Sequence, residues 1–226
     1  MRLYLSSYRF GDHFNALVGM AGLGARAGVI SNALDFIPEQ ARLDYARTIH
    51  DPLEDLRRAG MHAADLDLRR YFGQPARLEQ ALGELDLVWA VGGNAFLLRR
   101  AMRQSGFDRV IGSLVGEDRL IYGGWSAGAV VAGPSLHGIE LMDDPGVVAE
   151  GYDSPPVWAG LGLIDLCIVP HVRSDHPEAA AAKQVVALMT QDHVAFQPLS
   201  DGEVIIADGL DWALRPAGPA SSRAMS

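Results

Sequence analysis

The stretch that most constrains this chain is residues 120–132, LIYGGWSAGAVVA. Three apolar residues lead into two glycines, and small residues follow Ser126, so the pattern predicts a strand, a sharp turn and a helix. Ser126 has the G-x-S-x-G spacing of a nucleophile elbow. Strand and helix approach closely around such a serine, and its neighbours must therefore be nearly free of side chains. The first N–H groups of the helix, beginning at Ala127, would lie where an oxyanion could be stabilised.

Composition and charge narrow the class of protein. The chain has 226 residues, 49% of them hydrophobic and 21% charged, which suits one α/β domain over residues 1–226 with a frayed tail at 216–226. The net charge of −9 argues against nucleic acid or an anionic membrane as the partner. We find no apolar run of membrane-spanning length and no signal peptide, which predicts a cytoplasmic protein. The single cysteine, Cys167, excludes an internal disulfide and is expected to be a buried, inert thiol.

Strand-like and helical patterns alternate along the chain, which predicts a mostly parallel sheet with helices on both faces. A C-terminal hairpin is expected over residues 202–214. Two long helices are expected over residues 38–58 and 175–189, the second with Asp175 and Glu178 in capping-box spacing. The strands of the sheet are expected at residues 2–7, 29–33, 63–68, 87–91, 120–122 and 166–169.

Two glycine clusters have different interpretations. Residues 22–27 fit G-x-G-x-x-A, but a helical pattern precedes them and a strand follows, the reverse of the dinucleotide-binding order, so a helix C-terminal turn explains them better. Residues 91–94, VGGN, directly follow a buried strand. In an open parallel sheet this cluster shares the carboxyl edge with the elbow. Gly92 or Gly93 could then turn an N–H toward Ser126, with a plain strand-ending turn as the alternative.

A base for Ser126 is sought among the histidines, because a serine hydroxyl is a weak nucleophile. His171 follows the strand at 166–169 and is expected at the same edge. His176 and His137 are the competitors, and His176 is expected only to shape its loop. The seven histidines lack zinc-ligand spacing. No metal and no cofactor are predicted.

Three motifs together resemble the peptidase E (dipeptidase E) family of serine peptidases: YGGWSAGA at 122–129, VGGN at 91–94 and VPH at 169–171. The resemblance runs from the first strand to the terminal hairpin. It implies a flavodoxin-like three-layer α/β sandwich, related to the class I glutamine amidotransferase fold, with Ser and His in place of Cys and His. It also implies hydrolysis of a peptide bond next to a free N-terminus. The best-known members are dipeptidases selective for N-terminal aspartate.

The resemblance implies a mechanism in which Ser126 attacks the carbonyl carbon and His171 transfers the proton, while N–H groups of Gly93 and Ala127 hold the oxyanion. The triad acid is expected between Ser126 and His171 in chain order. Glu140 is the predicted acid, because the apolar residues around it could lock its side chain, and Asp143 is the reserve choice.

Substrate contacts are predicted from Asn94 and Arg173. Arg173 lies two residues past His171, so in an extended segment it would point to the same side and could grip a carboxylate. The segment after His171 is shorter than in aspartate-selective members, which leaves the preferred side chain open. A small peptide is the expected partner, and the assembly stays open between a monomer and a homodimer. A cyanophycinase-like hydrolase or esterase with the same residues, or a catalytically silent ligand-binding module, are the alternatives.

Overall fold

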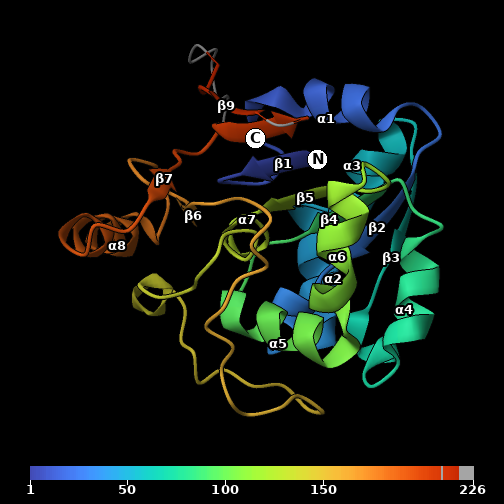
Figure 1. Cartoon of the computed structure of the whole chain (residues 1–226), viewed down its shortest axis with the longest axis horizontal. Helices are drawn as coiled ribbons and strands as arrows, with labels where there is room; N and C mark the ends of the chain where they lie inside the picture. Colours follow the sequence, from blue (N-terminus) through green and yellow to red (C-terminus); the bar gives the residue numbers. More distant parts are fainter. Residues whose placement is uncertain (210, 219–226) are drawn as a thin grey trace.

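The computed structural model describes residues 1–209 and 211–218, so the last eight residues of the predicted tail lie outside the described chain. A central sheet is covered by helices on both faces (Figure 1). In the described residues its strand order is β3-β2-β4-β5-β1-β8-β9. The strands of this sheet are β1 (Arg2–Ser6), β2 (Arg26–Ile30), β3 (His62–Asp65), β4 (Leu87–Ala90), β5 (Ile121–Trp125), β8 (Val204–Asp208) and β9 (Asp211–Arg215).

The first five strands run parallel, and the last two form an antiparallel hairpin on β1. The predicted parallel sheet and C-terminal hairpin are therefore confirmed. Strand β4 is buried along its whole length, as its continuous apolar sequence requires. Its Ala90 pairs with Gly124 of β5. Residues three positions beyond each partner, Gly93 and Ala127, thus leave the sheet at the same edge.

The helices form two outer layers that make the fold a three-layer sandwich. Helices α1 and α3 pack on one face through Leu17 and Leu56, helices α4 to α7 lie on the other, and α8 packs against β6. Helix α2 has no buried residue. No helix in the described chain has the length and apolar character needed to cross a membrane. The helices are α1 (Phe14–Ala21), α2 (Glu39–Thr48), α3 (Pro52–Arg58), α4 (Pro75–Leu82), α5 (Ala95–Ser105), α6 (Phe107–Gly116), α7 (Ala127–Val130) and α8 (Ala179–Gln191).

The glycine-rich segment at 22–27 ends a helix, as expected. Gly22 follows α1 with φ of 85°, and its N–H donates to the Val18 carbonyl before β2 begins. By contrast, the helix expected over residues 38–58 is wrong as one piece. It is interrupted after Thr48, and Asp51 caps α3 by accepting the N–H groups of Leu53 and Glu54. Pro52, which lacks an N–H, occupies the first turn of the new helix, where none is needed.

The strand expected at 166–169 exists but belongs to a different sheet. Strand β6 (Cys167–Val169) pairs in parallel with β7 (Phe196–Pro198), and these two strands form a small sheet of their own. Figure 1 shows this pair beside α8, next to the main sheet. The buried thiol of Cys167 contacts the Ser135 carbonyl, and burial raises its pKa, which fits the expected inert cysteine.

Packing around the elbow predicts a steric test. A Cβ on Gly128, in α7, would overlap the carbonyl oxygen of Ala90. Gly128→Ala should therefore destabilise the fold by about 1–3 kcal/mol through overpacking. Gly112→Ala is the matched control, because a Cβ on Gly112, in α6, would meet nothing within 4 Å, and this variant should gain stability. Thermal unfolding of both variants checks this, and equal melting temperatures would contradict it.

Candidate active site

The elbow has the strained geometry that its sequence predicts. Ser126 lies between β5 and α7 with φ of 49° and ψ of −117°, a conformation that L-residues rarely adopt. Its N–H donates to the carbonyls of Ser6 and Ser7, at 3.2 Å each, which anchors the turn on β1. A Cβ on Gly124 would come within 2.7 Å of the Gly128 backbone, so the glycines of the motif are required by close approach.

The structure brings His171 to Ser126. Nε2 of His171 lies 3.2 Å from Oγ of Ser126, and the imidazole is only 1% exposed. His171 follows β6 with φ of 62°. Its backbone N–H donates to Oγ of Ser7 at 2.7 Å. A buried imidazole with a hydroxyl at Nε2 has the arrangement of a general base beside its nucleophile.

The far nitrogen of the imidazole is held by Asp201. Oδ1 of Asp201 lies 2.8 Å from Nδ1 of His171, and the Asp201 side chain is 8% exposed. Burial acts to raise the pKa of this carboxyl, but hydrogen bonds from His171 and Ser7 outweigh burial and hold the pKa below its ordinary value. An ionised carboxylate at Nδ1 keeps the proton there, which leaves a lone pair on Nε2 facing Ser126.

This arrangement corrects the expectation of a Ser126–His171–Glu140 triad. Glu140 is exposed, and its Oε2 accepts the N–H of Gly138 at 2.6 Å. The reserve choice, Asp143, accepts the N–H of Ala95 at 2.8 Å. The acid at the imidazole comes after the histidine in the chain. The position of this acid depends on the pairing of β6 with β7, which the sequence does not reveal.

Ser7 is a further residue that sequence reasoning missed. Its hydroxyl accepts the N–H of His171 and donates to Asp201 at 2.8 Å, while its carbonyl accepts the N–H of Ser126. It thereby contacts all three members of the Ser126–His171–Asp201 group. The available signal was a polar residue directly after the first strand, at the edge where the other motifs gather.

The predicted oxyanion-hole residues lie at the edge of the sheet beside the elbow. Ala127 opens α7, so its N–H belongs to the first helical turn and lacks an intrahelical partner. Gly93 has φ of 134°, and a Cβ there would meet the Ala33 carbonyl. Asn94 has a structural role, and its predicted substrate contact stays a prediction. Its side chain accepts the N–H of Leu97, which caps α5, and donates to the Asp144 carbonyl.

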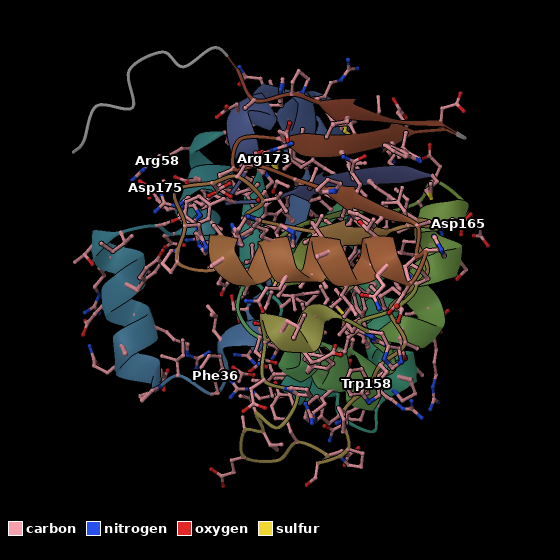
Figure 2. The ribbon with its side chains drawn as sticks, turned by 90° about the vertical axis from the view of Figure 1, so that its left-hand side faces the viewer. Phe36, Arg58, Trp158, Asp165, Arg173 and Asp175 are labelled. Carbon is pink, nitrogen blue, oxygen red and sulfur yellow. The ribbon has the colours of Figure 1, made fainter. Side chains whose placement is uncertain are left out.

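The segment after His171 is a tight loop, where an extended segment and a helix were expected. Arg173 has φ of 57°, so the extended backbone expected after His171 is wrong, and its side chain is exposed on the surface near Asp175 (Figure 2). Helix α8 begins only at Ala179, and Asp175 does not cap it. The loop instead folds His176 over His171, with the two rings stacked at 3.6 Å and 7° apart.

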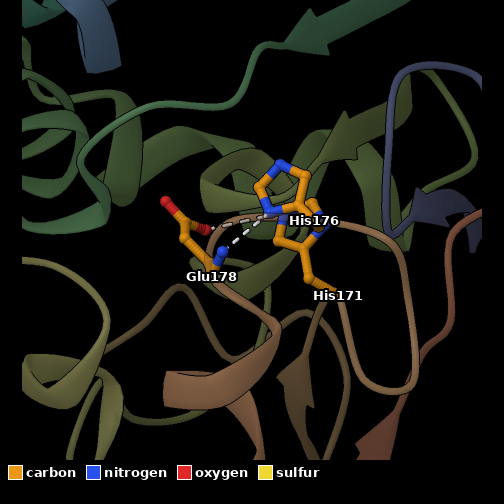
Figure 3. Close-up of side chains that lie close together, drawn as sticks. All are labelled: His171, His176 and Glu178. Atoms are coloured by element: carbon orange, nitrogen blue, oxygen red, sulfur yellow. Dashed lines mark hydrogen bonds and ion pairs between the residues drawn. The ribbon is translucent and has the colours of Figure 1, made fainter.

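One group of potential metal ligands exists among the described residues. His171, His176 and Glu178 each offer a ligand atom within 4.8 Å of the others. Figure 3 shows Glu178 beside the nitrogens of the two stacked rings. Burial, and next the neighbouring His171, lower the pKa of His176.

A cavity of about 430 Å³ reaches the elbow at Trp125. It lies at the carboxyl ends of β2 and β4, with Leu34 and Val91 among its apolar walls. Asp65 and Arg42 contribute charge to its lining. Trp125 directly precedes Ser126 in the chain, so the cavity provides space next to the elbow for a small part of a substrate.

Comparisons with known proteins agree with this geometry. The family model described as Peptidase family S51 matches residues 25–214. An uncharacterized peptidase of Pasteurella multocida is 23% identical over 92% of this chain and 93% of its own. Peptidase E of Streptomyces coelicolor is 34% identical over 66% of this chain and 60% of its own.

A solved structure also shares the fold. The crystal structure of a putative peptidase E protein from Listeria monocytogenes has a TM-score of 0.74 and 22% identity, and the match covers 96% of this chain and 98% of that one. Its likeness confirms the α/β sandwich. The family model covers most of the chain, including the elbow with Ser126, the imidazole of His171 and the carboxylate of Asp201. The chain therefore belongs to peptidase family S51 and is a peptidase similar to peptidase E.

Proposed function

We propose that this chain is a serine peptidase that cleaves the peptide bond after the N-terminal residue of dipeptides or short peptides. The observation that carries the proposal is the continuous relay from Ser126 Oγ to His171 Nε2, at 3.2 Å, and from His171 Nδ1 to Asp201, at 2.8 Å. The exopeptidase part rests on the resemblance of the elbow, glycine and histidine motifs to a family that acts next to a free N-terminus.

In the proposed reaction, Oγ of Ser126 attacks the scissile carbonyl carbon as Nε2 of His171 takes its proton. The N–H groups of Gly93 and Ala127 stabilise the resulting oxyanion. His171 then protonates the leaving amine. In the second half of the reaction, His171 takes a proton from water, the water attacks the acyl group on Ser126, and His171 returns the proton to Oγ of Ser126. Asp201 stabilises the imidazolium throughout. The cavity beside Trp125 accommodates part of the substrate.

Two carboxyl groups near the imidazole differ in their suitability as the triad acid. The pKa of Asp143 is raised to about 7, and desolvation is the largest cause. The N–H of Ala95 and the nearby His171 act to lower this pKa, whereas Glu178 acts to raise it. A group that is only partly ionised at neutral pH is a poor partner for an imidazolium. Asp201, whose hydrogen bonds keep it ionised, is the better one.

Substitution of the three relay residues tests the proposal. Ser126→Ala and His171→Ala should each remove nearly all turnover, on the order of 10⁶-fold, because residues that act as a unit lose most of the rate together. Asp201→Asn should lower turnover by up to about 10⁴-fold. The measurements are kinetics on aminoacyl anilides, dipeptides and simple esters, and covalent labelling of Ser126 by a fluorophosphonate.

Glu140→Gln is the matched control for the acid and should retain near-normal turnover. A collapse in Asp143→Asn with normal activity in Asp201→Asn would transfer the role to Asp143. Labelling that persists in Ser126→Ala would refute the nucleophile. Turnover of esters alone would favour an esterase, and a chain with neither labelling nor turnover would be a ligand-binding module.

We further propose that Arg173 contacts a substrate carboxylate, either an acidic side chain or a dipeptide C-terminus. Arg173 is exposed and lies two residues beyond His171, so it is the cation nearest to the proposed base in the chain. A charge-assisted hydrogen bond contributes about 1.5–3 kcal/mol, so Arg173→Ala should lower kcat/KM by about tenfold or more on substrates that carry the carboxylate. Arg119→Ala, also exposed, is the control. If Arg173→Ala lowers kcat/KM equally for substrates with acidic and with neutral N-terminal residues, the contact with an acidic side chain is excluded. If the kinetics are unchanged on all substrates, the contact with a dipeptide C-terminus is excluded as well.

The raised pKa of Asp143 predicts how stability depends on pH. With a folded-state pKa of about 7 and an ordinary value of 3.8, the native state binds this proton more tightly than the unfolded chain. The stabilisation is fully present below pH 3.8 and is lost as the pH rises through 7. Asn does not titrate, so Asp143→Asn avoids this loss of stability. The melting temperature of the variant should therefore exceed that of the native chain, and by more at pH 8 than at pH 5. Thermal unfolding at both pH values measures this, and an equal difference at both would contradict the raised pKa.

A further inference from the structure

The loop between β6 and α8 places three ligand-type side chains at one point. His176 stacks on His171 at 3.6 Å, and the ring of Tyr8 packs edge-on against both imidazoles, at 5.6 and 6.1 Å. The N–H of Glu178 donates to Nδ1 of His176 at 3.2 Å. That nitrogen therefore carries a lone pair and no proton, and a metal ion would bind it in place of the Glu178 N–H.

The carboxylate of Glu178 completes the group. Its Oε2 lies 3.7 Å from Nε2 of His171, and the side chain is 39% exposed, so an ion can reach it from solvent. Although Glu178 stands at the cap position of α8, its side chain makes no capping hydrogen bond. The carboxylate is therefore not committed to holding the helix.

The chemistry and spacing fit zinc. Imidazole nitrogens and carboxylate oxygens bind zinc at about 2.0–2.2 Å, so two ligand atoms of a tetrahedral site lie roughly 3.4 Å apart. The 3.7 Å between Glu178 and His171 is already close to that value, and all three ligand atoms lie within 4.8 Å. His176 would turn out of its stack with His171 to bind, because the in-plane lone pairs of two parallel rings do not converge on one ion. The ionised carboxylate of Asp201, which accepts a hydrogen bond from His171, adds negative charge that favours a dication.

We propose that His171, His176 and Glu178 bind a zinc ion, and that bound zinc holds the enzyme inactive. The inhibitory part rests on the proposed function. Nε2 of His171 is the atom that lies 3.2 Å from the Ser126 hydroxyl. Its single lone pair cannot ligate zinc and accept the serine proton together. Zinc therefore removes the base without touching the nucleophile, and release of the ion restores the relay.

The test measures zinc binding and Ser126 reactivity separately. Calorimetric titration of the chelator-treated full chain with zinc alone should give one site. The same addition should slow fluorophosphonate labelling of Ser126, and a chelator should restore it. His176→Asn and Glu178→Gln should each weaken zinc binding by at least about tenfold, the loss that even an outer-shell partner of a metal causes. Each variant is compared with its own zinc-free labelling rate.

Two controls separate this site from surface binding. Asp175→Asn changes an exposed acid of the same loop, and His137→Asn changes an exposed histidine that stacks on Trp158. Both should bind zinc like the native chain. Unchanged affinity in His176→Asn and Glu178→Gln, or zinc that binds without slowing the labelling, would overturn the proposal. If Ser126 fails to label even without zinc, the proposed function fails, while calorimetry still decides whether the zinc site exists.

Discussion

The hydroxyl of Ser7 accepts the N–H of His171 at 2.7 Å and donates to Asp201 at 2.8 Å, and the Ser7 carbonyl accepts the N–H of Ser126. Ser7 is fully buried at the end of β1, the strand between β5 and β8. This one residue, which directly follows β1, therefore sets the relative positions of three segments that are far apart in the chain. Without that hydroxyl, the Asp201 carboxylate and the His171 N–H would each lose a buried partner.

Two of these segments hold unfavourable backbone conformations. Ser126 and His171 have φ values of 49° and 62°, in the region that non-glycine residues rarely adopt. Such conformations persist only where surrounding contacts over-determine them. At Ser126 the contacts are the close approach of Gly124 to Gly128 and the carbonyls of Ser6 and Ser7, which accept the Ser126 N–H. At His171 they are the Ser7 hydroxyl and the pairing of the next residue, Val172, with Leu199.

The small sheet of β6 and β7 couples the base to its acid. Val169 pairs with Pro198, and the N–H of Leu199 continues the ladder to the Val169 carbonyl. His171 and Asp201 follow these two strands by two and three residues, so the register that aligns the strands also aligns the imidazole with the carboxylate. The loop beyond His171 then returns His176 over the base before α8 begins.

The sequence alone determined the elements whose cause is local. The elbow at Ser126 follows from glycines that close packing demands, the buried strand β4 from its unbroken apolar run, and the position of His171 from the end of an apolar strand. Only the tertiary structure decided the acid. Asp201 lies 30 residues beyond His171, and nothing near it in the chain marks it, because its position depends on a strand pairing between distant segments. The same holds for Ser7, for the break in the helix at Asp51 and for the stacking of His176 on the base. A residue's local neighbours predict its backbone conformation, whereas its partners across the fold depend on register and packing, which act between segments.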